Sequence, residues 1–133
     1  MELSFNRAQA ALEYMIIAAT LLLATALMLA YILPSYNNAV QIDQANTALN
    51  TLTATADKVY ALGPGSALIA EINLPDGITS IKPEGKTITI KFNGSSSIAV
   101  FDFNVSGTIP STKGYHKVQA IAVDENVNFI EVV

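Results

Sequence analysis

The chain has 133 residues and a formal net charge of −4, and this acidic balance excludes the broad basic face that nucleic-acid binding requires. It contains no cysteine, which excludes disulfides and thiolate metal sites but leaves the cellular compartment open. The charges are unevenly distributed, because residues 57–133 hold fourteen of the eighteen charged side chains. Residues 1–56 hold the other four, Glu2, Arg7, Glu13 and Asp43. The composition therefore predicts an apolar N-terminal arm and a water-facing C-terminal part.

Residues 10–33 form a nearly continuous apolar segment, and Met15 to Leu33 carry no charge over nineteen residues. The abundance of Ala, Leu, Met and Ile favours a helix over a strand. At about 1.5 Å per residue, the uncharged stretch falls just short of the roughly 30 Å core of a bilayer. Because Arg7 precedes the segment, the positive-inside tendency predicts that residues 1–8 are cytoplasmic and that most of the chain lies outside the cell.

Two ordinary interpretations of this segment are weaker than a third. A cleaved secretory signal is disfavoured because the apolar run ends in Tyr31-Ile32-Leu33-Pro34 and leads into more helical sequence. A plain single-pass anchor stays open, but it leaves Glu13 unexplained. A carboxylate within an apolar segment costs several kcal/mol unless it is paired or protonated.

The third interpretation rests on the string Arg7-Ala8-Gln9-Ala10-Ala11-Leu12-Glu13-Tyr14. This string, with the apolar run to about residue 33, resembles the Q-x-x-x-E-Y pattern of archaeal type IV pilins with class III signal peptides. The resemblance implies that a membrane aspartyl protease, the prepilin peptidase, cuts between Ala8 and Gln9. It implies that residues 1–8 are a cleaved leader, and that Gln9, Glu13 and Tyr14 take part in assembly.

A physical argument supports a role for Glu13 in such a filament. Cleavage would create a new α-amine on Gln9, and in a stack of staggered helices the Glu13 carboxylate can lie against the α-amine of a neighbour. Within a lipid-like core, that pair offsets much of the desolvation cost of both charges. We therefore expect Glu13 to set the axial register of the subunits.

Beyond the apolar segment, we expect Pro34 to kink or interrupt the helix, with Ser35 able to cap a restart. The helix should then continue as an amphipathic one and end at Gly63-Pro64-Gly65, so the predicted helix covers residues 9–62. Its narrow apolar stripe consists of Ile42, Ala45, Leu49, Leu52, Ala56 and Val59, and we expect it to pack on the chain's own C-terminal domain.

Residues 63–133 should form a β-rich head, because the hydrophobic period shifts towards two. We expect strands at 67–73, 78–82, 87–92, 98–105, 115–123 and 127–133. We expect turns at 75–77, 83–86, 93–95 and 124–126, and a loop at 106–114. Five or six strands with short connections predict an antiparallel sheet. The predicted fold class is α+β, a long hydrophobic N-terminal helix followed by a small antiparallel β head, as in type IV pilins.

No catalytic constellation is visible in the sequence, so we expect a non-enzymatic protein without cofactor. His116 is the only histidine and is expected near the start of a strand. Asp124 and Glu125 are adjacent in a predicted turn, where such a pair is usually solvated, and Asp102 should point away from the core. Neither metal-ligand spacing nor a phosphate-binding loop is present.

Two N-x-S/T acceptor patterns begin at Asn93 and Asn104. If the head is extracellular, both are candidates for N-glycosylation, and Asn93 should be better exposed because it lies in a hairpin turn.

The resemblance implies a major pilin, a homopolymer built through the N-terminal helices. Its partners would be lipid before assembly, the prepilin peptidase, and an assembly platform with its ATPase. The precursor would reside in the membrane, and the mature filament would lie on the cell surface and serve adhesion. A minor or priming pilin is the first alternative. A monomeric membrane-anchored extracellular binding module, an anchored enzyme and an archaellin are the others.

Overall fold

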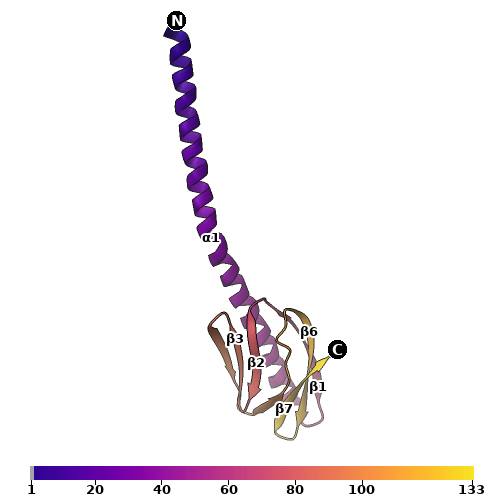
Figure 1. The fold of residues 1–133 in the computed structure, drawn as a ribbon. Coiled ribbons are helices and arrows are strands. Elements are labelled where there is room, and N and C mark those ends of the chain that lie inside the picture. Colours follow the sequence, from indigo (N-terminus) through magenta and orange to yellow (C-terminus); the bar gives the residue numbers. More distant parts are fainter. Residues whose placement is uncertain (1) are drawn as a thin grey trace. The chain divides into compact units, whose positions relative to one another are not determined.

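The computed structural model describes the backbone of residues 2–133 and the side chains from residue 5 onward, and it contains one helix followed by seven strands (Figure 1). The elements are α1 (Glu2–Leu62), β1 (Ala67–Leu74), β2 (Ile78–Glu84), β3 (Thr87–Phe92), β4 (Ser95–Val100), β5 (Asn104–Gly107), β6 (Gly114–Val123) and β7 (Asn126–Val132). This layout is α+β, with one long apolar N-terminal helix and a small, mainly antiparallel β region, which is consistent with a pilin-like fold.

The chain divides into two compact units, Met1–Ala39 and Val40–Val133. The division falls inside α1, so the second part of the helix belongs to the same unit as the strands. The described residues of the first unit are all helical, whereas the second unit contains a hydrophobic core.

The helix ends where the sequence predicts. Gly63 follows the last helical residue with a φ of 91°, and its backbone N–H donates to the carbonyl oxygen of Tyr60 at 3.1 Å. A residue with positive φ at this position closes the last turn, and glycine adopts it without steric cost. Pro34 lies inside α1, and the helical backbone continues on both sides of it without interruption. A bend at Pro34 stays a prediction.

The strands form two sheets rather than one. One sheet has the order β1-β6-β7-β5 and the other the order β2-β3-β4. All neighbouring pairs are antiparallel except β5 and β7, which run parallel with Asn104 opposite Asn126. The predicted antiparallel arrangement is confirmed for every pair but this one, and the structure has seven strands in two sheets where five or six in one sheet were expected. β5 and β7 run parallel because β6, which is antiparallel to β7, lies between them along the chain.

The predicted strand at 98–105 is in fact two strands. Phe101, Phe103 and Val105 all point into the core, so the alternation of side chains continues through the break. The hydrogen-bonding partner changes, however, because β4 pairs with β3 and β5 pairs with β7. The N–H of Phe101 donates to the carbonyl of Lys86 at 2.8 Å as the chain crosses from one sheet to the other. A sequence pattern reports which way a side chain points, and it does not report which strand lies alongside.

One turn and one loop are shorter than predicted. The β2–β3 turn contains only Gly85 and Lys86, because Pro83 and Glu84 still pair with β3. The loop expected at 106–114 is shortened at both ends, since β5 runs to Gly107 and β6 begins at Gly114. The hairpin turn at Asn93-Gly94 is confirmed.

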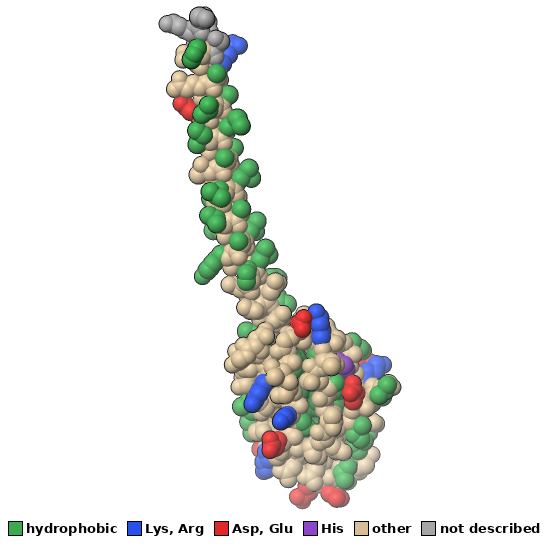
Figure 2. Space-filling view, viewed as in Figure 1, with side chains coloured by type: hydrophobic (Ala, Val, Ile, Leu, Met, Phe, Trp, Pro, Cys, Tyr) green, Lys and Arg blue, Asp and Glu red, His purple; other side chains and the backbone are tan. Residues whose placement is uncertain are grey.

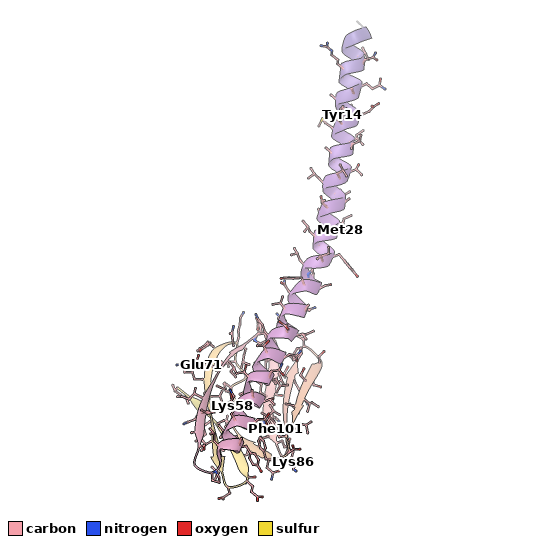
Figure 3. The ribbon with its side chains drawn as sticks, turned by 180° about the vertical axis from the view of Figure 1, so that it is seen from behind. Tyr14, Met28, Lys58, Glu71, Lys86 and Phe101 are labelled. Atoms are coloured by element: carbon pink, nitrogen blue, oxygen red, sulfur yellow. The ribbon has the colours of Figure 1, made fainter. Side chains whose placement is uncertain are left out.

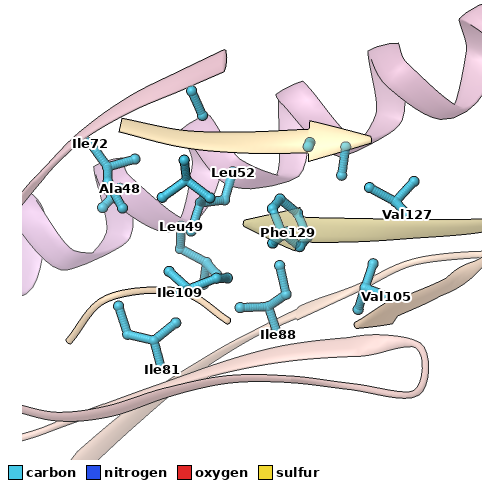
Figure 4. Packing of buried hydrophobic residues seen from close by; sticks show 14 of the residues in the cluster. Ala48, Leu49, Leu52, Ile72, Ile81, Ile88, Val105, Ile109, Val127 and Phe129 are labelled. Atoms are coloured by element: carbon cyan, nitrogen blue, oxygen red, sulfur yellow. The ribbon is translucent and has the colours of Figure 1, made fainter. Parts of the chain in front are cut away.

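The core of the second unit lies between α1 and the two sheets. Figure 4 shows Leu49 and Leu52 of α1 among side chains from the strands, including Phe129 of β7 and Ile88 of β3. The helix contributes Ala45, Ala48, Leu49, Leu52, Ala56 and Val59. The predicted stripe is thus confirmed except at its start, because Ile42 is 42% exposed. Ile42 lies one turn before the first buried position, where the neighbouring Gln41 accepts a hydrogen bond from Asn93 of the β3–β4 turn.

Candidate functional site

The feature that most needs a functional explanation is the apolar segment, residues 10–33 of α1. Every large hydrophobic side chain in it is at least about half exposed, from Ile32 at 49% to Tyr31 at 81%. Figure 2 shows hydrophobic side chains distributed along the visible face of this part of the helix, and Figure 3 shows Tyr14 and Met28 on it. A helix that is apolar all round is stable only within an apolar environment.

By length and composition α1 can cross a membrane, and its most apolar stretch is not buried at all. The two threonine hydroxyl groups within the apolar segment have partners inside the helix. Thr20 donates to the carbonyl of Ile16 at 2.8 Å, and Thr25 donates to that of Leu21 at 2.8 Å. Such bonds satisfy the hydroxyls without water. These observations are compatible with membrane anchoring.

Glu13 differs from these threonines. Among the described residues, no hydrogen bond or ion pair reaches its carboxylate, and it lies one turn into the apolar segment. Its neighbour Tyr14 is 75% exposed. A carboxylate at this position needs a partner from another molecule or contact with polar surroundings if the helix enters lipid.

The proposed cleavage point also lies in α1. Ala8 and Gln9 are both helical and exposed. Cleavage between them stays a prediction, as do the assembly roles of Gln9, Glu13 and Tyr14.

The two sequon asparagines differ in their surroundings. Asn93 lies in the β3–β4 turn with a φ of 42°, and its side-chain N–H donates to Gln41 at 3.1 Å. Asn104 begins β5 and is exposed. Neither modification is tested by the geometry, and both stay predictions.

An open hollow of about 550 Å³ in the second unit was not anticipated from the sequence. Tyr60 stacks on Phe103 with ring centroids 4.2 Å apart, and this pair forms part of its wall. The rest of the lining is polar and consists of Lys86, Asp102, Asn104, Asp124, Glu125 and Asn126. No local pattern could have placed these residues together, because they come from the helix and three separate turns or strand ends.

His116 lies near the start of β6, as expected, and its side chain is only 16% exposed. Its Nδ1 lies 3.2 Å from a carboxylate oxygen of Glu131, and its Nε2 lies 2.9 Å from the carbonyl of Thr112. These contacts join β6, β7 and the loop before β6. The His116 side chain therefore holds the end of β7 and the loop before β6 against β6.

On the exposed side of the first sheet, Glu71 of β1 contacts two residues of β6. A hydrogen bond from Tyr115 and another from Lys117 lower the pKa of the Glu71 carboxyl, and the Lys117 Nζ lies 3.4 Å from it. The same contact with Glu71 raises the pKa of the Tyr115 hydroxyl. All three groups are solvated, so they orient side chains on the surface rather than build a reactive site.

Neither models of protein families, nor curated proteins, nor solved structures give a significant match to this chain. Within residues 5–133, whose side chains the structure describes, no three His, Cys, Asp or Glu side chains converge in a way that could hold a metal ion. The apolar segment and Glu13 are therefore the features from which a function must be argued.

Proposed function

We propose that this chain is the structural subunit, the major pilin, of an extracellular type IV pilus-like filament. The apolar segment anchors the precursor in the membrane and, after cleavage between Ala8 and Gln9, forms the filament core with identical helices. The second unit is carried outside as the head. The filament serves attachment to surfaces, and a cytoplasmic ATPase and an assembly platform drive its growth.

The observation that carries the proposal is that residues 10–33 of α1 expose every apolar side chain and hold a single acid, Glu13, near their start. The ten Leu and Ile side chains of the apolar segment favour insertion by about 3–6 kcal/mol in total, at about 0.3–0.6 kcal/mol each. A charged side chain at the bilayer centre costs about 3 kcal/mol on the same type of scale, and less near an end of the segment. The precursor therefore stays inserted despite Glu13.

In the filament the same segment needs apolar neighbours on all sides, and identical helices supply them. Glu13 is then matched by the new α-amine of Gln9 on an adjacent subunit. Only one axial stagger brings these two groups together. The pair therefore selects the register among many staggers that bury similar apolar area.

The test is to isolate surface-shed protein and determine its N-terminus and its assembly state. We expect the mature chain to begin at Gln9 and to occur in filaments. We expect Glu13→Ala to reduce filament yield by about tenfold or more, since breaking a buried pair costs about 3–5 kcal/mol. Membrane insertion and cleavage should be unchanged. Glu84→Ala, an exposed acid on β2, is the matched control.

Equal filament yields for the two variants would overturn the register role of Glu13. A chain that begins at Gln9 but never polymerises would overturn the filament itself. A processed subunit found in trace amounts relative to another pilin would indicate a minor or priming pilin.

A monomeric, membrane-anchored extracellular binding module is the second candidate, and the hollow beside Tyr60 and Phe103 favours it. Its volume of about 550 Å³ lies within the common range of ligand sites. Retention of residues 1–8 in the mature protein would support this candidate over the filament.

A further inference from the structure

Four strands form the edges of the two sheets, and three of them carry features that prevent pairing with another chain. β2 has an irregular register between Ile78 and Ser80, and it contains Lys82 and Pro83. A bulge, a lysine and a proline are the devices by which natural edge strands avoid pairing.

The two edges of the first sheet are also protected. The N–H of Val105 in β5 donates to the carbonyl of Gly85 at 2.6 Å, so the β2–β3 turn covers that short strand. β1 carries Glu71 near its middle.

β4 has no comparable protection. Ser95 to Val100 include no charge and no proline, and the six pairs with β3 run in unbroken register. Ser97 faces the core side, where its hydroxyl donates to Asn46 of α1 at 2.8 Å. Ile98 and Val100 face the opposite side and are 58% and 73% exposed. β4 lies next to β3, which is labelled in Figure 1.

We propose that β4 is an interaction surface that pairs, antiparallel, with β4 of a second copy of this chain. An antiparallel self-pair places neutral residues opposite neutral residues, whereas β1 and β2 would bring a charge against this apolar edge. The register of this pair follows from the requirement that the exposed side chains of both copies lie on the same face of the joined sheet. With Ile98 opposite Ile98 of the second copy, Val100 lies opposite Ser96 and all the exposed side chains stay on one face.

This contact goes beyond the proposed filament and does not depend on it. It joins two heads through their backbones, and it would link subunits or whole filaments side by side. The three-stranded sheets of the two copies would join into one six-stranded sheet. The exposed Ile98 side chains of the two copies would then lie against each other.

The chain has no cysteine, so single cysteines can map the contact in the full-length protein in detergent micelles. We expect Ile98→Cys to form a disulfide-linked dimer under mild oxidation about tenfold faster than Ile69→Cys, because directly opposite cross-strand residues meet the distance that a disulfide requires. Ile69 on β1 is the matched control, since it is 54% exposed.

Two further variants test the register and the edge. An equal mixture of Ser96→Cys and Val100→Cys should cross-link faster than either variant alone. Adding Val100→Lys to Ile98→Cys should slow dimer formation to about the rate of the control, as lysine does on natural edges. Equal rates for Ile98→Cys and Ile69→Cys would mean that the copies associate through their helices or not at all, and this would overturn the proposal.

Discussion

The two parts of α1 share one backbone conformation and differ in where their apolar side chains go. In residues 40–62 the apolar side chains form a narrow stripe, and Leu52 and Val59 are fully buried against the sheets. In residues 10–33 they surround the helix, and Leu22 is 71% exposed. The first arrangement is complete within one chain, and the second needs lipid or other helices.

This difference teaches that helical conformation and burial are separate questions. Most helical stability in proteins comes from packing rather than from propensity. The second part of α1 obtains that packing from Phe129, Ile88 and their neighbours in the same chain. The first part has no such packing within its own chain. Its apolar side chains can be packed only by lipid or by other helices.

The largest expected effect tests this comparison with the same substitution in both parts of the helix. Leu52→Ala should reduce the free energy of unfolding of the head by about 2–5 kcal/mol, because it leaves a cavity in a closed core. Leu22→Ala should change it by less than about 0.5 kcal/mol. Urea unfolding of the full-length protein in detergent, followed by circular dichroism of the strands, measures both.

A loss of head stability in Leu22→Ala similar to that in Leu52→Ala would contradict the division of the chain into two units. Leu49→Ala provides a second core position, in case Leu52→Ala does not fold well enough to be measured. Leu49 is 6% exposed, so its loss should also be large.

An added arginine should have the opposite pattern of effects, large in residues 10–33 of α1 and absent in residues 40–62. Leu22→Arg should oppose membrane insertion by about 3 kcal/mol, because arginine at the centre of a spanning segment is costly. Asn50→Arg places the same side chain on the exposed face of the second part of α1 and should leave insertion unchanged. The membrane-bound fraction after alkaline extraction measures both variants.

If Leu22→Arg remained fully membrane-bound, the apolar segment would not be centred in the bilayer. If Asn50→Arg detached as readily, the second part of α1 would also take part in membrane binding. Either result would weaken the contrast between the two parts of the helix.

The sequence predicts most of the helix and of the core, but it does not predict which strands pair with each other. The stripe from Ala45 to Val59 and the turn at Asn93 follow from local periodicity and turn chemistry. The break between β4 and β5 could not be predicted, because side-chain alternation continues through Phe101 and Phe103 while the paired strand changes. The parallel pairing of β5 with β7 is equally non-local.

The candidate site divides in the same way. The apolar segment and Glu13 are visible in the sequence, since composition alone marks them. The stack of Tyr60 on Phe103 and the contact of His116 with Glu131 are not, because each joins residues that only the folded chain brings together.

The smallest expected effect contrasts an acid in water with the acid in the apolar segment. The folded-state pKa of Glu71 lies below its ordinary value of 4.5, chiefly because of the hydrogen bond from Tyr115. A lowered carboxyl pKa contributes stability above that ordinary value, and the contribution is lost as the pH falls through the lowered pKa. The raised pKa of Tyr115 means that its share is present below the ordinary value of 10.0 and is lost at higher pH.

Tyr115→Phe should therefore raise the pKa of Glu71 towards 4.5 without reaching it, because Lys117 still contacts the carboxylate. Titration of the Glu71 side-chain carbon signal by NMR measures the shift, and Lys117→Met is the matched variant. A larger rise in Lys117→Met than in Tyr115→Phe would show that charge, rather than the tyrosine hydroxyl, dominates at this surface. Solvent screens such a contact, so its loss should leave the head folded. In the proposed filament, by contrast, Glu13→Ala would leave the α-amine of a neighbouring Gln9 with neither a partner nor water, and it should reduce filament yield by about tenfold or more.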